Sequence, residues 1–176
     1  MEINWQISKS QKELLDSLFD AIELKEIKNV LDIGSGRTSI FYLTDRFKNL
    51  NIKGVVYPGD QRKINPIKEC VKNSNYELIE TDIKDLNLDE TLDVILAHLF
   101  LGEAEQFGKN RYVEMLERLF FIKTRYLVLV NLFRDNIDYG LLLKEISSKG
   151  SITKLGYIKS ESGEDCLGIL IKLNNF

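Results

Sequence analysis

The sequence predicts an α/β fold, a Rossmann-like three-layer sandwich with a mostly parallel sheet and a C-terminal antiparallel hairpin. Two observations predict it. Five short apolar runs alternate with segments of helical periodicity over residues 29–150, and this alternation is typical of parallel strands joined by crossover helices. Two further apolar runs, 152–159 and 166–173, are separated only by residues 160–165, and a loop that short suits a hairpin.

The N-terminal segment has the pattern of an amphipathic helix. Ser10 and Glu13 have the spacing of a capping box. Apolar residues then recur on one helical face, namely Leu14, Leu15, Leu18, Phe19 and Ile22. A first buried strand is expected over 30–33, where a short apolar run meets a glycine turn. A helix is expected to follow over 38–47.

The same alternation continues through the middle of the chain. Asn65 and Pro66 suit the N-cap and the first position of a helix that runs to Val71. A helix is also indicated by the spacing of Tyr112 and Met115. The remaining expected strands are 52–57, 76–80, 92–97 and 126–130, and a last helix is expected over 139–149.

Polar and glycine residues follow the expected strands. In an open parallel sheet, ligands bind outside the carboxyl ends of the strands, so these residues mark the candidate site. They are Gly34-Ser35-Gly36, Pro58-Gly59-Asp60, Thr81-Asp82, His98 and Asn131. The strongest signal is the glycine turn, which lets backbone amides and a helix N-terminus approach a ligand. The alternative is that these glycines only make the turn tight.

Residues 30–36 have the sequence VLDIGSG. This run resembles the first motif of the class I, seven-stranded S-adenosylmethionine-dependent methyltransferases, a family whose sheet also ends in an antiparallel hairpin. The resemblance implies S-adenosyl-L-methionine as cofactor. It places Asp32, Gly34 and Gly36 beside the methionine and ribose, and Asp82, with the amide of Ile83, beside the adenine amino group. The full set of implied cofactor residues is Asp32, Gly34, Ser35, Gly36, Asp60, Asp82, Ile83 and Ala97.

Two positions depart from the family pattern. Arg37 follows Gly36, so the third glycine of the motif is absent. The second expected strand also ends without the acid that usually binds the ribose hydroxyls. Asp60, the carboxylate nearest to that position, is the candidate for this role, with Tyr57 as a partial substitute and a solvated turn residue as the alternative. For Asp82 the alternative is a turn or helix cap.

Residues 92–98 resemble the fourth-strand motif of small-molecule methyltransferases, in which a histidine often follows the strand. They lack the Asn-Pro-Pro-aromatic signature of enzymes that methylate amino groups of nucleic acids. His98 is therefore the candidate general base, since imidazole titrates in the required range; the alternative is a structural histidine. Glu103 and Glu105 are weaker candidates. Trp5 is expected either to cover the substrate with the first helix or to pack in the core.

Composition narrows the class of protein further. The net charge is -3, so nucleic acid as a partner is unsupported. No apolar run is long enough to cross a membrane, and the N-terminus lacks a signal-peptide layout. Cys70 and Cys166 have no partners at metal-ligand spacing, so we expect no metal site. A cytoplasmic protein with one domain over 1–176 is expected, with a helical extension (1–28) and a core (29–176); the oligomeric state is open.

Three functions follow from these observations. The first is methyl transfer from S-adenosyl-L-methionine to a small-molecule acceptor. The second is a non-catalytic cofactor-binding module of the same fold that acts through a partner. The third, a nicotinamide-binding Rossmann domain, requires a glycine or alanine at Ser39 and an acid near the end of the second strand, and neither is present.

Overall fold

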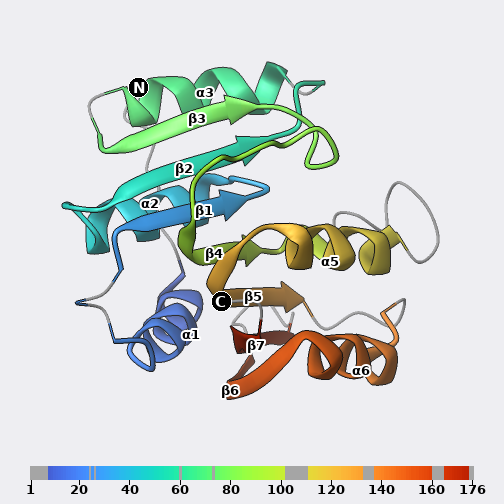
Figure 1. The fold of residues 1–176 in the computed structure, drawn as a ribbon. Helices are drawn as coiled ribbons and strands as arrows, with labels where there is room; N and C mark the ends of the chain where they lie inside the picture. The colour runs from blue at the N-terminus through green and yellow to red at the C-terminus, as the bar shows by residue number, and fades with distance from the viewer. Residues whose placement is uncertain are drawn as a thin grey trace.

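The fold is that of a computed structural model, which describes residues 8–23, 25, 27–59, 61–72, 74–101, 111–132, 137–159 and 165–174. Figure 1 shows its helices and strands alternating along the chain. In order they are α1 (Lys9–Phe19), β1 (Asn29–Ile33), α2 (Arg37–Arg46), β2 (Asn51–Val56), α3 (Gln61–Val71), β3 (Tyr76–Glu80), β4 (Leu92–His98), α5 (Arg111–Phe121), β5 (Thr124–Leu132), α6 (Tyr139–Lys149), β6 (Gly150–Lys159) and β7 (Asp165–Leu173).

The strands form one seven-stranded sheet in the order β3-β2-β1-β4-β5-β7-β6. The five strands β1 to β5 pair in parallel, whereas β7 pairs antiparallel with both β5 and β6. The predicted mostly parallel sheet with a terminal hairpin is therefore confirmed. The strand order reverses between β1 and β4, which is the point where ligands bind in open sheets of this kind.

Helices bury both faces of the sheet. One hydrophobic cluster joins alternate strand residues such as Val30 and Leu96 to α1, α2 and α3. A second cluster joins the intervening residues, such as Leu31 and Ile95, to α5 and α6. Because successive side chains of a strand point to opposite faces, a strand covered on both sides is apolar throughout. This explains the continuous apolar runs in the sequence.

The connection from β3 to β4 has no helix. Figure 1 shows it running across the sheet in front of β2 and β1 before it enters β4. Ile83, Leu86 and Leu88 pack against the second cluster from this segment. Near the end of this connecting segment, Oε1 of Glu90 lies 2.6 Å from the amine of Lys53 in β2. An extended segment therefore covers part of this face where a crossover helix was to be expected.

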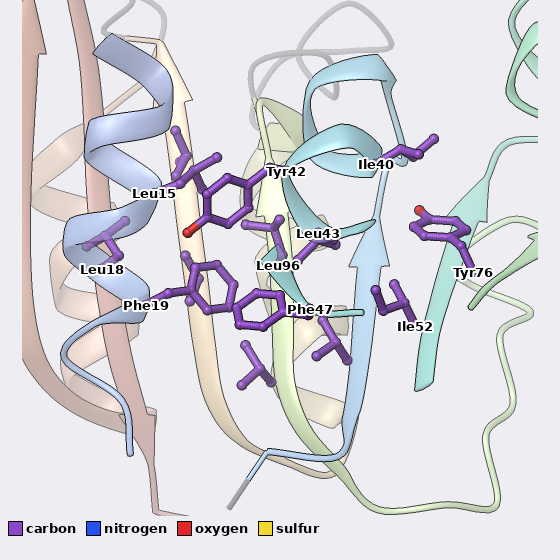
Figure 2. Packing of buried hydrophobic residues seen from close by; sticks show 14 of the residues in the cluster. Leu15, Leu18, Phe19, Ile40, Tyr42, Leu43, Phe47, Ile52, Tyr76 and Leu96 are labelled. Carbon is purple, nitrogen blue, oxygen red and sulfur yellow. The ribbon is translucent and has the colours of Figure 1, made fainter. Parts of the chain in front are cut away.

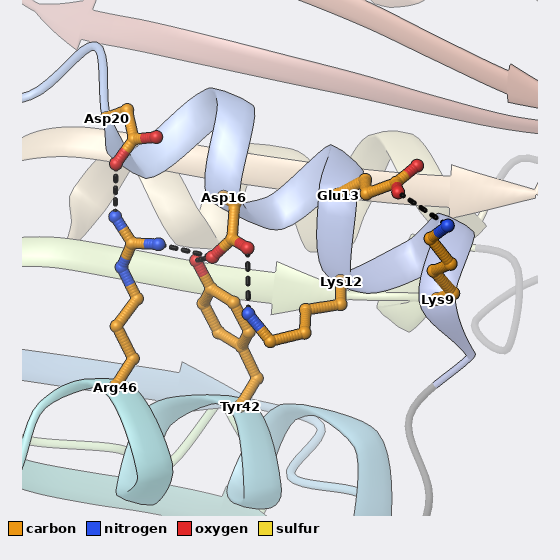
Figure 3. Close-up of polar contacts among 7 residues, drawn as sticks. All are labelled: Lys9, Lys12, Glu13, Asp16, Asp20, Tyr42 and Arg46. Atoms are coloured by element: carbon orange, nitrogen blue, oxygen red, sulfur yellow. Dashed lines mark hydrogen bonds and ion pairs between the residues drawn. The ribbon is translucent and has the colours of Figure 1, made fainter.

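Helix α1 is held to the rest of the molecule by packing and by charge. Figure 2 shows Phe19 of α1 against Tyr42 and Phe47, with ring centroids 5.6 Å and 5.2 Å apart respectively. Figure 3 shows Arg46 of α2 bridging two carboxylates, that of Asp16 in α1 and that of Asp20, the C-cap residue of α1. The N-terminal helix is thus packed onto the same face of the sheet as α2.

Three local predictions need correction. The N-cap of α1 is Ser8, whose Oγ accepts the N–H of Gln11, so Ser10 lies inside the first turn and the predicted capping box is wrong. Helix α2 begins and ends one residue earlier than predicted. Helix α3 begins at Gln61 and contains Pro66 in its interior. Burial of the apolar residues on one side of α3 outweighs the loss of the hydrogen bond that proline cannot donate; these residues are Ile64, Ile67 and Val71.

No helix among the described residues is both long enough and apolar enough to span a membrane.

Candidate functional site

The carboxyl ends of β1 and β4 bring most of the predicted site residues together. Asp32 pairs in register with Leu96, and Ile33 pairs with Ala97. The glycine turn after β1 and His98 at the end of β4 are therefore neighbours at one edge of the sheet. Asp82 lies beyond β2, after β3. Four other predicted residues lie outside the described part of the chain, namely Trp5, Asp60, Glu103 and Glu105.

The centre of this edge is the buried carboxyl group of Asp32, which has no exposed surface. Its Oδ2 accepts two hydrogen bonds, at 2.6 Å from the hydroxyl of Tyr76 and at 2.7 Å from Oγ of Ser39. The hydroxyl of Ser35 lies 2.7 Å from that of Tyr76 and donates to the backbone oxygen of Asp32. Oδ1 of Asp32, also buried, has no hydrogen-bond partner among the described residues.

Burial controls the charge of this carboxyl group. It raises the pKa of Asp32 from its ordinary value to about 6, although the hydrogen bonds from Tyr76, Ser39 and Ser35 act in the opposite direction. Burial and the neighbouring carboxylate raise the pKa of Tyr76 well above its ordinary value, so the phenol stays protonated and donates. Asp32 is mostly ionised at neutral pH.

The backbone amides of the glycine turn donate hydrogen bonds to other groups of the protein. The N–H groups of Gly34 and Ser35 both donate to the carbonyl of Val55, each at 3.0 Å. The N–H of Gly36 donates to Oγ of Ser39 at 3.2 Å. The end of β2 and the first turn of α2 therefore take up these three amides.

The two glycines of the turn have different structural roles. Gly34 has φ +70°, and a Cβ there would lie 2.9 Å from Cδ2 of Phe100, so the fold itself requires glycine at this position. Gly36 is the N-cap of α2 with an extended backbone, and a Cβ there would meet only the oxygen of Gly34, at 3.8 Å. No described protein atom requires glycine at position 36.

His98 lies at the end of β4 with 7% of its surface exposed. Its Nε2 atom is buried and has no hydrogen-bond partner among the described residues. Burial lowers the pKa of His98 from 6.5 to about 4, so the ring is neutral at neutral pH. The chain then turns sharply through Leu99, which has φ 59°, a strained conformation for a residue with a side chain.

Asp82 forms a turn after β3. Its Oδ1 accepts the N–H of Lys84 at 3.0 Å, and its backbone oxygen accepts the N–H of Asp85 at 2.9 Å. This is the turn-capping role named above as the alternative. An ionised carboxylate has about four acceptor sites, so the turn leaves capacity for an amino group. The side chain of Ile83 packs against the second cluster.

Sequence reasoning missed three residues of this site. Tyr76 and Ser39 bond to Asp32, and Gly54 gives Tyr76 its path across β2. The available signal was Gly54 itself, because a glycine inside an apolar strand often marks a close approach of another group. The local sequence around Gly54 does not indicate that the approaching group is Tyr76.

No protein-family model matches the chain, and no curated protein matches it. Solved structures do resemble it. The 16S rRNA methylase RmtB has a TM-score of 0.65 at 20% identity, over 94% of this chain and 62% of that one. An rRNA methylase from Escherichia coli has a TM-score of 0.64 at 22% identity, over 94% of this chain and 66% of that one.

A third similar structure is the N-methyltransferase NodS from Bradyrhizobium japonicum WM9, in complex with S-adenosyl-L-homocysteine. Its TM-score is 0.70 at 15% identity, over 92% of this chain and 84% of that one. The present chain spans less than two thirds of the length of the two rRNA methylases. Together with the strand order β3-β2-β1-β4-β5-β7-β6, these likenesses show that the chain has the fold of the class I S-adenosylmethionine-dependent methyltransferases.

Proposed function

We propose that this protein is an S-adenosylmethionine-dependent methyltransferase with a small-molecule acceptor. The observation that carries the proposal is the buried Oδ1 of Asp32, which has no hydrogen-bond partner among the described residues. A Cβ on nearby Gly36 would meet only the backbone oxygen of Gly34, at 3.8 Å. Asp32 and Gly36 both lie at the end of β1, where the strand order reverses. A ligand with a cationic or hydroxyl donor at this point would satisfy the carboxylate.

The residues present fit S-adenosyl-L-methionine. A buried acceptor without a donor costs about 1–3 kcal/mol, and the ammonium and ribose hydroxyls of this cofactor are donors that relieve the cost. Asp32, Gly34, Ser35, Gly36 and Ala97 would hold the methionine and ribose part. Asp82 and the amide of Ile83 would hold the adenine, and Asp60 would bind the ribose hydroxyls. When bound, the cofactor supplies a methyl group made electrophilic by its sulfonium.

Little is then required of the protein beyond alignment of the acceptor and removal of its proton. His98 is the proposed proton acceptor, at Nε2. A pKa of about 4 makes it a weak base, which suits an acceptor whose proton becomes strongly acidic only as its lone pair is used for the new bond. Neutral imidazole also orients such an acceptor by hydrogen bonding before the transfer.

Charge favours a small acceptor over a nucleic acid. The net charge of -3 provides no electrostatic attraction for a phosphate backbone. Among the similar structures, NodS is described as an N-methyltransferase and RmtB as an rRNA methylase, so the fold by itself does not set the class of acceptor. A second candidate is a module that binds the cofactor without turnover. It is favoured by Val56, which ends β2 as a buried apolar residue where an acid usually binds the ribose.

The test is cofactor binding by isothermal calorimetry and thermal shift, with S-adenosylhomocysteine and NAD in parallel. A ligand at about a hundred times its dissociation constant stabilises a fold by about 2.7 kcal/mol, a shift of roughly 5 °C or more for a chain of this size. We expect this shift with S-adenosylhomocysteine. Stabilisation by NAD alone would replace the proposal, and binding without turnover across a metabolite screen would identify the non-catalytic module.

A further inference from the structure

The side chain of Tyr76 crosses an entire strand to reach Asp32. Tyr76 begins β3 and pairs in register with Ile52 of β2, while Gly54 pairs with Asp32 of β1. A Cβ on Gly54 would lie 2.0 Å from the Tyr76 hydroxyl oxygen. The ring therefore lies over β2 in space that only glycine leaves free, on the face of the sheet seen in Figure 2.

This crossing determines which carboxylate oxygen is bonded. The hydroxyl groups of Tyr76 and Ser39 both donate to Oδ2 of Asp32, at 2.6 Å and 2.7 Å. The other oxygen, Oδ1, is buried without a partner among the described residues. Two donors on one oxygen, from β3 and from α2, hold the carboxyl group in one orientation and leave the second oxygen available for a ligand.

We propose that Tyr76, together with Ser39, is a positioning residue that orients Asp32 so that Oδ1 faces the cofactor and stays able to accept its cationic donor. This inference rests on the proposed function, since it assigns a role in binding S-adenosyl-L-methionine. Tyr76 touches neither the methyl group nor the acceptor in this scheme. It acts through Asp32, and its contribution is measured in affinity and in the pH dependence of affinity.

The pH dependence follows from the surroundings of Asp32. Tyr76 faces it from β3, Ser39 from α2 and Ser35 from the glycine turn, and Tyr76 is the titratable member. Gly54 of β2 and Leu96 of β4, its partners in register, carry no charge. His98, two residues beyond Leu96 on the same face, is neutral in this pH range because burial lowers its pKa to about 4. The bond from Tyr76 opposes the effect of burial on the Asp32 pKa, so loss of the hydroxyl raises that pKa further and removes the negative charge at a higher pH.

The experiment is calorimetric binding of S-adenosylhomocysteine between pH 5.5 and 8.5 to the full chain and to Tyr76→Phe, which keeps the ring over Gly54. At pH 7.5 we expect affinity to fall about tenfold to a hundredfold, because a carboxyl group that is no longer oriented loses its own hydrogen bond to the cationic donor of the ligand, and a bond to a charged group is worth that much. The pH at which affinity declines should rise by about one unit. The matched control is Tyr42→Phe, which removes a buried hydroxyl bonded to Asp16, and its affinity should equal that of the wild type.

The outcomes separate the two proposals. If the wild type does not bind S-adenosylhomocysteine, the proposed function fails. If the wild type binds and Tyr76→Phe binds equally well with an unchanged pH profile, the role of Tyr76 is overturned while the function stands. Should Tyr76→Phe fail to fold, Ser39→Ala removes the second donor to Oδ2, and the same losses support the proposal whereas unchanged binding contradicts it.

Discussion

Asp32 and His98 lie on the same face of adjacent strands, and burial moves their pKa values in opposite directions. Asp32 pairs with Leu96, two residues before His98 in β4, so the three side chains share the face covered by α1 and α2. Burial raises the pKa of Asp32 to about 6 and lowers that of His98 to about 4. Each group prefers to be neutral because water is excluded.

Opposite shifts predict opposite contributions to the pH dependence of stability. For Asp32 the folded-state pKa exceeds the ordinary value of 3.8. The stability that this group contributes is therefore complete at low pH and is lost as pH rises through 6. For His98 the folded-state pKa is below the ordinary value of 6.5, so stability is present above pH 6.5 and is lost as pH falls towards 4. Between about pH 4 and 6 the two slopes, each about 1.4 kcal/mol per pH unit, cancel.

Single substitutions should reveal each slope. Asp32→Asn leaves the histidine slope, so its unfolding free energy should fall as pH decreases from 6.5 to 4.5. His98→Gln leaves the aspartate slope, so its unfolding free energy should rise over the same change. Urea unfolding of the cofactor-free protein at three pH values measures both. The exposed Asp85→Asn is the control and should follow the wild type; three parallel profiles would contradict the burial argument.

Gly36 and Gly34 provide a matched pair for the ligand site. Gly36→Ser retains a good N-cap residue and meets no described protein atom closely, so stability should change by less than about 0.5 kcal/mol. Affinity for S-adenosylhomocysteine should fall at least tenfold, since the side chain fills the proposed cofactor space. Gly34→Ala should instead destabilise the apoprotein by about 1–2 kcal/mol because of its positive φ. Wild-type affinity in Gly36→Ser would show that the ligand does not contact this turn.

Gly54→Ala tests the passage of Tyr76 across β2. The added methyl would lie 2.0 Å from the tyrosine hydroxyl oxygen, so the ring must move and the bond to Asp32 must lengthen. We expect a loss of about 1–3 kcal/mol in unfolding free energy, typical of overpacking. In a Tyr76→Ala background the same substitution should cost only a few tenths of a kcal/mol, and additive losses in this double-mutant cycle would argue against the contact.

His98→Asn tests the proposed proton acceptor once an acceptor substrate is known. Affinity for the cofactor should stay within a factor of about three, while turnover should fall by about a hundredfold, the lower end for a positioned base, because the lowered pKa makes the ring a weak base. At saturating cofactor the wild-type turnover should be flat from pH 8 down to pH 6, since the ring is already neutral. Turnover equal to that of the wild type would contradict the role of His98 as proton acceptor. The protein would then promote the reaction only by aligning the acceptor with the cofactor.

The succession of strands and helices along the chain and the position of the glycine turn could be predicted from the sequence. Runs such as 30–33 and 92–97 are apolar throughout because both sheet faces are covered, and this signal is local. The motif VLDIGSG placed Asp32 and the turn at the end of the first strand. Helix limits were less accurate. Ser8 rather than Ser10 caps α1, and α3 includes Pro66, since tertiary burial outweighed local preference at Pro66.

The sequence by itself determined the alternation of strands and helices, the terminal hairpin and the candidate motif, because these follow from periodicity and turn chemistry within a few residues. Only the tertiary structure decided the environment of Asp32. Tyr76 lies 44 positions away along the chain and reaches the carboxyl group because β3 is placed beside β2, with Gly54 beneath the ring. The opposite pKa shifts of Asp32 and His98 arise in the same way, since exclusion of water depends on the helices that pack over the sheet and not on neighbouring residues in sequence.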